Sequence, residues 1–225
     1  MEFDPTRDQI ALTIPKFRLR HGADLGRNEV YIVSVAIDES GLANPQTALS
    51  FGVSTVIPNL KKWSWHHFGG DGFMFYGPKK PGSFVSYALY YMESDQTGRD
   101  VGAQLKTLIG NQEVKDAVSG IGSIAQMAGV AASKANLVTA TLVNVAKVVA
   151  KLMADDQDDY LHLSHGTLFR DQIDGSEPYH AGEEFRNPPA YHIEDIISVR
   201  ALIQEGGERG QAVVTTLEEV EVPAG

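Results

Sequence analysis

The sequence predicts a mainly β fold of the α+β class, an antiparallel β-sandwich that a long helical hairpin interrupts. Three observations support this prediction. Residues 9–92 contain short runs of alternating apolar and polar side chains, residues 101–154 switch to a helical spacing, and residues 160–222 return to strand-like patterns. A length of 225 residues suits one large domain or two small ones, and we expect a single domain over residues 1–225, with the helices inserted into the sandwich.

The strands predicted in the first part are separated by turn signals. Alternating apolar residues occupy positions 10–19, 31–37, 49–53 and 85–91, and residues 72–76 form a short aromatic run. Glycine and proline clusters such as residues 69–72 and 78–82 lie between them, which is typical of sandwiches and barrels. Pro15 falls inside the first run and has no N–H to donate, so it predicts an edge strand or a bulge there.

A helical period begins near Asp100 and continues to about residue 153. Gly110-Asn111 is expected to end a first short helix, and Lys134-Ala135-Asn136 is expected to form a corner between two longer helices. Apolar side chains at helical spacing then form a stripe along each longer helix, and the candidate functional residues are Val118, Ile121, Ile124, Gly129, Val138, Leu142, Val145 and Val149.

Strand-like sequence returns after the helices. Residues 160–169 resemble a strand, and residues 170–190 resemble a loop that contains three prolines. Residues 193–203 are rich in β-branched side chains, which favours a core strand, although their length also permits a short helix, and residues 213–222 suggest a final strand. These segments are expected to complete the sandwich that residues 9–92 begin.

Residues 117–146 carry a single charge, Lys134, which is unusual for a surface helix of an acidic protein. Ala125, Gly129 and Ser133 recur every four residues, a spacing that lets helix backbones approach closely in membranes. One hypothesis is a non-enzymatic, membrane-active or toxin-like effector whose hairpin inserts into lipid. The alternative is a soluble binding or assembly module, in which the hairpin is a static packing element or an interface of a homo-oligomer.

Composition limits the first of these hypotheses. A membrane-spanning helix needs about 20 predominantly apolar residues. Residues 117–133 contain three glycines, three serines and a glutamine, so their insertion into a bilayer would be marginal.

Acidic residues flank both ends of the helical segment. Glu93, Asp95 and Asp100 precede it, and Asp155, Asp156, Asp158 and Asp159 follow it. If the hairpin extends from one end of the sandwich, both groups meet at its base. Calcium prefers several carboxylate oxygens, so Glu93, Asp95, Asp155, Asp156 and Asp158 are candidate calcium ligands. A solvated acidic turn is the alternative, since residues 155–159 lack the glycine and the terminal glutamate of a calcium loop.

Two loop–strand junctions carry a resemblance to a known family. The segments Gly26-Arg27-Asn28-Glu29-Val30-Tyr31 and Asp155-Asp156-Gln157-Asp158-Asp159-Tyr160-Leu161 place polar or acidic residues directly before a β-run. In this they resemble the calcium-dependent lipid-binding β-sandwich domains of the synaptotagmin type. The resemblance implies a sandwich with acidic loops at one end, calcium as a ligand and membrane lipid as a partner. Asn28 stands where that pattern favours an acid.

Composition and missing motifs exclude several classes of protein. The chain has no cysteine, which rules out disulfides, thiolate metal sites and cysteine nucleophiles. A net charge of −10 argues against nucleic acid as the main partner and against simple electrostatic docking on anionic lipid. No catalytic motif is found. The first residues lack a signal-peptide pattern, so we expect a cytoplasmic protein as made, or a bacterial effector exported by a dedicated machine.

An aromatic-rich region and the histidines complete the candidates. Trp63, Trp65, Phe68, Phe73, Phe75 and Tyr76 lie near Lys61 and Lys62. Such a patch could bind sugar, a partner or a membrane interface, although core packing and cross-strand pairs explain the pattern more simply. His66 and His67 would face opposite sides of a strand, and so would His162 and His165, so none of these pairs predicts a metal site.

Overall fold

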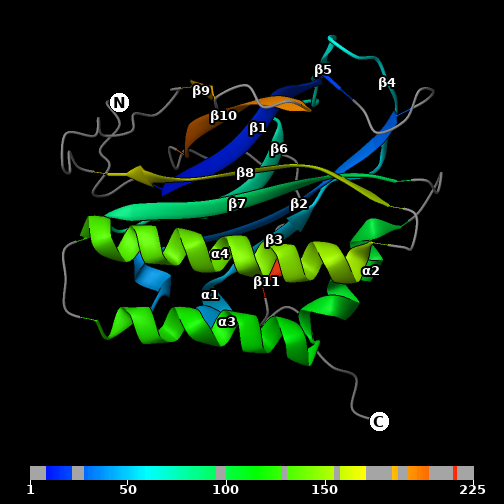
Figure 1. Ribbon diagram of the computed structural model, residues 1–225. Coiled ribbons are helices and arrows are strands. Elements are labelled where there is room, and N and C mark those ends of the chain that lie inside the picture. Colours follow the sequence, from blue (N-terminus) through cyan, green and yellow to red (C-terminus); the bar gives the residue numbers. More distant parts are fainter. Residues whose placement is uncertain are drawn as a thin grey trace.

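Two antiparallel sheets and a layer of helices make up the protein (Figure 1). The computed structural model describes residues 9–21, 28–94, 100–127, 131–154, 158–170, 184–186, 192–202 and 215–216. Over these residues, the prediction of a mainly β fold with helices between two groups of strands is confirmed.

The first sheet, sheet A, has the order β5-β1-β10-β9, with β6 also paired to β1. Its strands are β1 (Gln9–Leu19), β5 (Trp65–His67), β6 (Phe73–Lys79), β9 (Glu184–Arg186) and β10 (Ile193–Leu202). Strand β1 pairs on both sides, so it is not an edge strand. The register with β10 shifts between Thr13 and Lys16, which shows that Pro15 marks a bulge.

The second sheet, sheet B, has the order β11-β3-β2-β7-β8, with β4 also paired to β2. Its strands are β2 (Asn28–Asp38), β3 (Ser50–Val53), β4 (Ile57–Leu60), β7 (Phe84–Glu93), β8 (Asp159–Phe169) and β11 (Thr215–Thr216). Strands β7 and β8 are neighbours although the helices separate them in the sequence, so the helical segment is an insertion between paired strands. The remainder of the predicted final strand lies outside the described residues.

The helices begin and end at residues with clear local roles. They are η1 (Glu39–Gly41), α1 (Pro45–Ala48), α2 (Val101–Ile109), α3 (Gln112–Ala125) and α4 (Ala131–Met153). The carboxylate of Asp100 accepts the N–H of Ala103 and caps α2, and Gly110 ends that helix as predicted. Asn111 caps α3 by accepting the N–H of Glu113.

The corner predicted at Lys134-Ala135-Asn136 is wrong, because these residues lie inside α4. Alanine and lysine are good helix formers, and one asparagine costs too little to break a helix that tertiary packing stabilises. The change of direction comes earlier, between the end of α3 at Ala125 and the start of α4 at Ala131.

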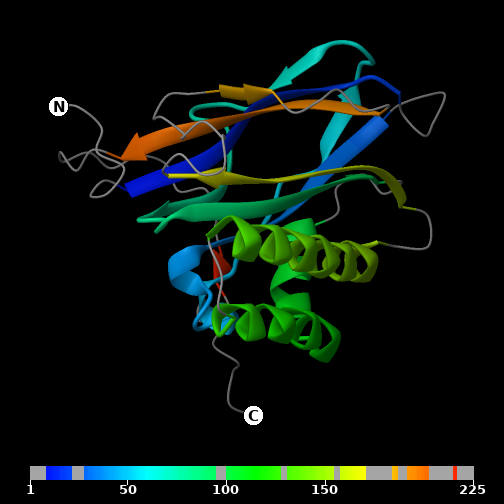
Figure 2. The same cartoon turned by 60° about the vertical axis from the view of Figure 1, so that its left-hand side comes forward.

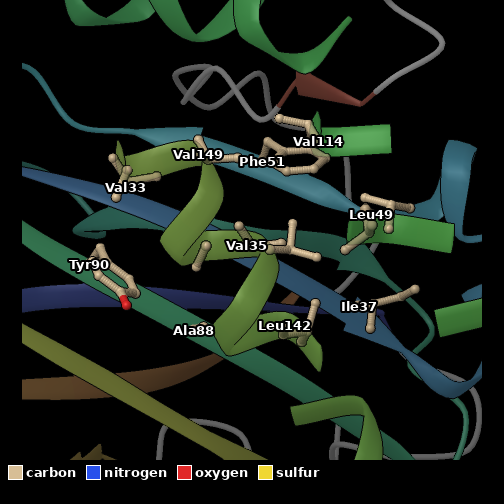
Figure 3. Packing of buried hydrophobic residues seen from close by; sticks show 14 of the residues in the cluster. Val33, Val35, Ile37, Leu49, Phe51, Ala88, Tyr90, Val114, Leu142 and Val149 are labelled. Atoms are coloured by element: carbon tan, nitrogen blue, oxygen red, sulfur yellow. The ribbon is translucent and has the colours of Figure 1, made fainter. Parts of the chain in front are cut away.

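The central strand β7 of sheet B is buried on both faces. All ten of its residues are buried, and its apolar side chains alternate between two apolar clusters. Leu89 and Tyr91 belong to the inter-sheet core, which packs between sheets A and B. Ala88 and Tyr90 belong to the helix–sheet core, which packs between sheet B and the helices (Figure 3). The molecule therefore has three layers, with sheet B in the middle (Figure 2).

The helices lie along the face of sheet B. From the sequence, we had considered a hairpin that extends from one end of the two sheets. Helix α4 runs over β7 and β2, and α3 lies beside α4 on the side away from sheet A (Figures 1 and 2). This placement has a simple cause. The apolar stripe of α4 and the apolar face of sheet B are both too large to leave in water, and they bury each other.

Candidate functional site

The predicted helical stripe faces the protein interior. Val118, Ile121, Val138, Leu142, Val145 and Val149 have no exposed area, and Ile124 is 6% exposed. All seven side chains belong to the helix–sheet core. Figure 3 shows Val149 near Val33 and Phe51, and Leu142 near Ile37 of β2 and Ala88 of β7. Gly129 lies outside the described residues.

Helix α4 also has the length and composition of a membrane span. Its 23 residues give a length of about 35 Å at 1.5 Å per residue, which exceeds the hydrocarbon thickness of a bilayer. Among the residues that the structure describes, it is the one helix that passes this test, with a mean hydropathy of 1.3. A core helix of a soluble protein passes the same test, so composition does not decide between the two hypotheses.

The end of sheet B brings together some of the acidic residues that flank the helical segment. Glu93 and Asp159 are direct partners in the ladder between β7 and β8. Asp158 precedes β8 and accepts a hydrogen bond of 2.9 Å from the hydroxyl of Tyr31. Asp100 caps α2, where its side chain accepts a hydrogen bond from the N–H of Ala103.

These acidic residues do not all face the same way. Glu93 is buried and shares a face of β7 with Tyr91, on the inter-sheet side, because side chains alternate along a strand. Asp158 binds Tyr31, which belongs to the helix–sheet core on the other face. Within the described residues, no group of three His, Asp or Glu side chains is placed to hold a metal ion. Asp95, Asp155 and Asp156 lie outside them, so calcium binding stays a prediction.

A groove runs between α4 and strand β8, at the end of the strand order of sheet B. It has a volume of about 460 Å³ and is lined by Asn136, Thr139, Ala140, Val143, His165, Gly166, Thr167 and Phe169. The hydroxyl oxygen of Thr167 lies 2.7 Å from that of Thr139 and 2.9 Å from that of Ser86. This chain of hydroxyls ties α4 to sheet B across the floor of the groove.

A buried polar network crosses the inter-sheet core. The hydroxyl of Tyr91 donates a hydrogen bond of 2.7 Å to the carboxylate of Asp195, and His162 stacks on the ring of Tyr91 with centroids 6.1 Å apart. Burial, followed by the neighbouring Asp195, raises the pKa of Tyr91 well above its ordinary value. Tyr91 has no exposed area, so this network fits a structural role better than a catalytic one.

His162 gives a testable dependence of stability on pH. Burial lowers its pKa below 6.5, and His192 and His165 add to this, whereas Asp195 opposes it. A lowered pKa means that the unfolded chain binds the proton more tightly, so the stabilisation is present above about pH 6.5 and lost as the pH falls through the folded-state pKa. We expect urea titrations of His162→Gln to show a shallower loss of stability below pH 6.5 than the parent. Equal slopes would contradict this assignment.

The paired histidines are separated as the strand pattern predicts. His66 contacts the ring of Phe17 on the inner face of β1, whereas His67 is exposed. His162 lies on the inter-sheet side, and His165 lines the groove beside α4.

The aromatic-rich region divides between core and surface. Phe75 and Tyr76 are fully buried in the inter-sheet core, as the packing interpretation predicted, and Phe68 and Phe73 pack against it. Trp63, however, is 52% exposed. Trp65 lies opposite Arg18 in the pairing of β1 with β5, and the Arg18 guanidinium is 4.9 Å from its ring centre.

Cations and indole rings gather here on a surface that we call the basic–aromatic face. It consists of Lys16, Arg18, Arg20, Lys61, Lys62, Trp63 and Trp65. The Arg20 guanidinium lies 5.0 Å from the centre of the Trp63 ring, and the Lys16 ammonium lies 5.4 Å from that of Trp65. These distances are within the range of cation–π attraction.

Two features hold this face in place. Trp63 has a φ of 67°, a left-handed conformation that is costly for a bulky residue, and its N–H donates to the carbonyl of Leu19 at 2.7 Å. Arg18 forms an ion pair with Glu194, whose side chain is fully buried. The indole and the guanidinium are therefore presented in a defined geometry.

Lys16 and Arg18 of β1, and Arg20 just after it, were not predicted as functional residues. The sequence does contain a signal for them, because Lys16, Arg18 and Arg20 alternate with Phe17 and Leu19, so a strand through these residues would carry the three cations on one face. Their proximity to Trp63 and Trp65 depends on the pairing of β1 with β5, which the alternation does not reveal.

Comparison with known proteins gives no relative: no protein-family model matches this chain, and no curated protein or solved structure matches it.

Proposed function

We propose that this protein is a non-enzymatic binding module, a β-sandwich whose helical hairpin α3–α4 is a fixed packing layer and whose function lies on its outer surfaces. The observation that carries the proposal is the complete burial of the α4 stripe against the middle sheet. If α4 had to leave sheet B in order to function, we would expect less of its apolar side to be buried.

The energy needed to release the helices supports this proposal. Removing α4 would expose its own Val138, Leu142 and Val149 together with the face of sheet B beneath them. Each large aliphatic side chain that is returned to water costs about 2 kcal/mol. Several such side chains on each surface would exceed the typical stability of a whole domain, about 5–15 kcal/mol, unless lipid replaces the lost contacts.

The same burial bears on self-assembly. The stripe that was considered as an oligomer interface is occupied by the protein's own sheet. A homo-oligomer of the packed form would therefore use another surface.

The membrane-active effector remains the second candidate, favoured by the length and hydropathy of α4. Within α4 the charged residues are only Lys134, Lys147 and Lys151. In that mechanism α4 must separate from sheet B before it can enter a bilayer.

A disulfide between α4 and β8 separates the two candidates. The hydroxyl oxygens of Thr139 and Thr167 are 2.7 Å apart, and the chain has no other cysteine with which a new thiol could pair. We expect the variant Thr139→Cys/Thr167→Cys to form this disulfide when oxidised. Under the binding-module proposal, neither its oxidised form, nor its reduced form, nor the parent releases dye from vesicles.

The reduced form and the two single-cysteine variants are the controls. Dye release by the parent and the reduced variant, with none by the oxidised variant, would overturn the proposal in favour of the effector. Release by every form would also contradict it, since leakage would then occur without separation of α4 from β8.

A further inference from the structure

The basic–aromatic face has the composition of a surface that contacts a membrane. We propose that it docks this protein, without calcium, onto the anionic headgroups of a lipid bilayer. This inference rests on the proposed function as a binding module, because it names the partner of that module. It does not require the helices to leave sheet B.

The face lies at a prominent position in the fold. Residues 61–64 connect β4 of sheet B to β5 of sheet A, and Lys61, Lys62 and Trp63 are all exposed. Figures 1 and 2 show this connection on the opposite side of the molecule from α3. A flat surface could therefore contact the turn and the end of β1 while the helix layer points away from it.

The charge of this face is opposite to that of the whole chain. Five cations, Lys16, Arg18, Arg20, Lys61 and Lys62, come together on a protein whose net charge is −10. Glu194 pairs with Arg18, and its side chain is buried beneath it. Because the rest of the protein is acidic, an anionic bilayer would repel other orientations and attract this one.

Trp63 favours lipid over a purely ionic partner. Its indole is half exposed at the tip of the turn, next to two lysines, and its backbone is held in a strained conformation. Tryptophan prefers the headgroup level of a bilayer, where the ring is buried and the N–H stays hydrated. The cation–π contacts with Arg18 and Arg20 keep the ring and the charges at the same level. An acidic polymer would need the cations but not this presentation of the ring.

Vesicle sedimentation of the full chain tests the proposal. The probes are vesicles of phosphatidylcholine with and without phosphatidylserine, in the presence of a calcium chelator. We expect binding only to vesicles that contain phosphatidylserine, and weaker binding at high salt. Lys61→Glu/Lys62→Glu should lower the affinity by about thirtyfold or more, since each lysine near such a surface contributes about a fivefold increase in affinity. Trp63→Ala should lower it by roughly tenfold.

A matched variant controls for net charge. Lys115 and Lys147 are exposed on α3 and α4, so Lys115→Glu/Lys147→Glu changes the net charge equally on the opposite layer. It should retain most of the parent's affinity. Circular dichroism and melting of each variant establish that it is folded.

Several results would overturn the proposal. These are no sedimentation with phosphatidylserine, sedimentation only when calcium is added, equal losses in the face variant and the matched variant, and binding to heparin without binding to vesicles. The oxidised Thr139→Cys/Thr167→Cys variant should sediment like the parent, because docking leaves α4 in place. If the parent neither docks on the vesicles nor releases dye from them, lipid is rejected as the partner, and the binding-module proposal remains intact.

Discussion

Replacing Leu142 with alanine is expected to lower the free energy of unfolding by about 3 kcal/mol. Leu142 has no exposed area and lies in the helix–sheet core, where Figure 3 shows it near Ile37 and Ala88. The substitution removes three carbon atoms from a packed interior, so it loses transfer free energy and leaves a cavity. Urea denaturation followed by circular dichroism measures the effect.

The same helix supplies a control with the same chemistry. Leu137 is 43% exposed on the outer face of α4, so Leu137→Ala should change the free energy of unfolding by less than about 0.5 kcal/mol. A small effect at both positions would mean that the stripe is not part of the stabilising core. The proposal that α3–α4 is a fixed packing layer would then lose its main support.

Replacing Asp195 with alanine is expected to destabilise the protein by about 3 kcal/mol. Asp195 is 1% exposed and accepts a hydrogen bond from the hydroxyl of Tyr91 across the inter-sheet core. Its removal leaves a buried hydroxyl without this acceptor and a cavity between β7 and β10. Thermal and urea unfolding of the variant, compared with the parent at neutral pH, check the magnitude.

A double-mutant cycle attributes this loss to the pair. Tyr91→Phe should cost about 1.5 kcal/mol, and Tyr91→Phe/Asp195→Ala should cost clearly less than the sum of the single changes, because the second substitution removes the group that the first left without a partner. Additive effects would show that Asp195 stabilises the fold through other contacts. None of these three variants changes a residue of the basic–aromatic face, so vesicle binding by the folded protein should be unchanged.

These two predictions concern the two cores, and together they describe why sheet B can act as the rigid middle of the molecule. Its strand β7 contributes Tyr91 to one core and Ala88 to the other. The turn after β4 follows a strand that pairs with β2 of sheet B, and it leads to β5, which pairs with β1. We therefore expect the packing of sheet B to help position the basic–aromatic face.

Much of the fold could be predicted because side-chain periods are local. The spacing of Val138, Leu142, Val145 and Val149 identified the buried face of α4 correctly, and Gly110 identified the end of α2. From Pro15 we predicted an edge strand or a bulge. The sequence could not decide between them, because the sequence of one strand does not reveal how many strands pair with it. The corner at Lys134 was misplaced, since weak helix-breaking residues yield to tertiary packing.

The candidate sites were less predictable. The acidic residues at both ends of the insertion were expected to converge, and Glu93 and Asp159 do become ladder partners. Side chains alternate along a strand, however, so Glu93 and Tyr31 lie on opposite faces of sheet B, and Asp158 is bonded to Tyr31. The low-charge insertion was identified correctly from the sequence. Its apolar face, however, belongs to the helix–sheet core.

By itself, the sequence determined which residues alternate, which step at helical spacing and that the chain is acidic overall, because these properties depend only on local geometry and composition. Only the tertiary structure decided that Arg18 meets Trp65 on β5 and Glu194 on β10, a residue 176 positions away. Which strands become neighbours depends on how distant apolar faces bury one another. A basic surface on an acidic protein is therefore a product of the fold.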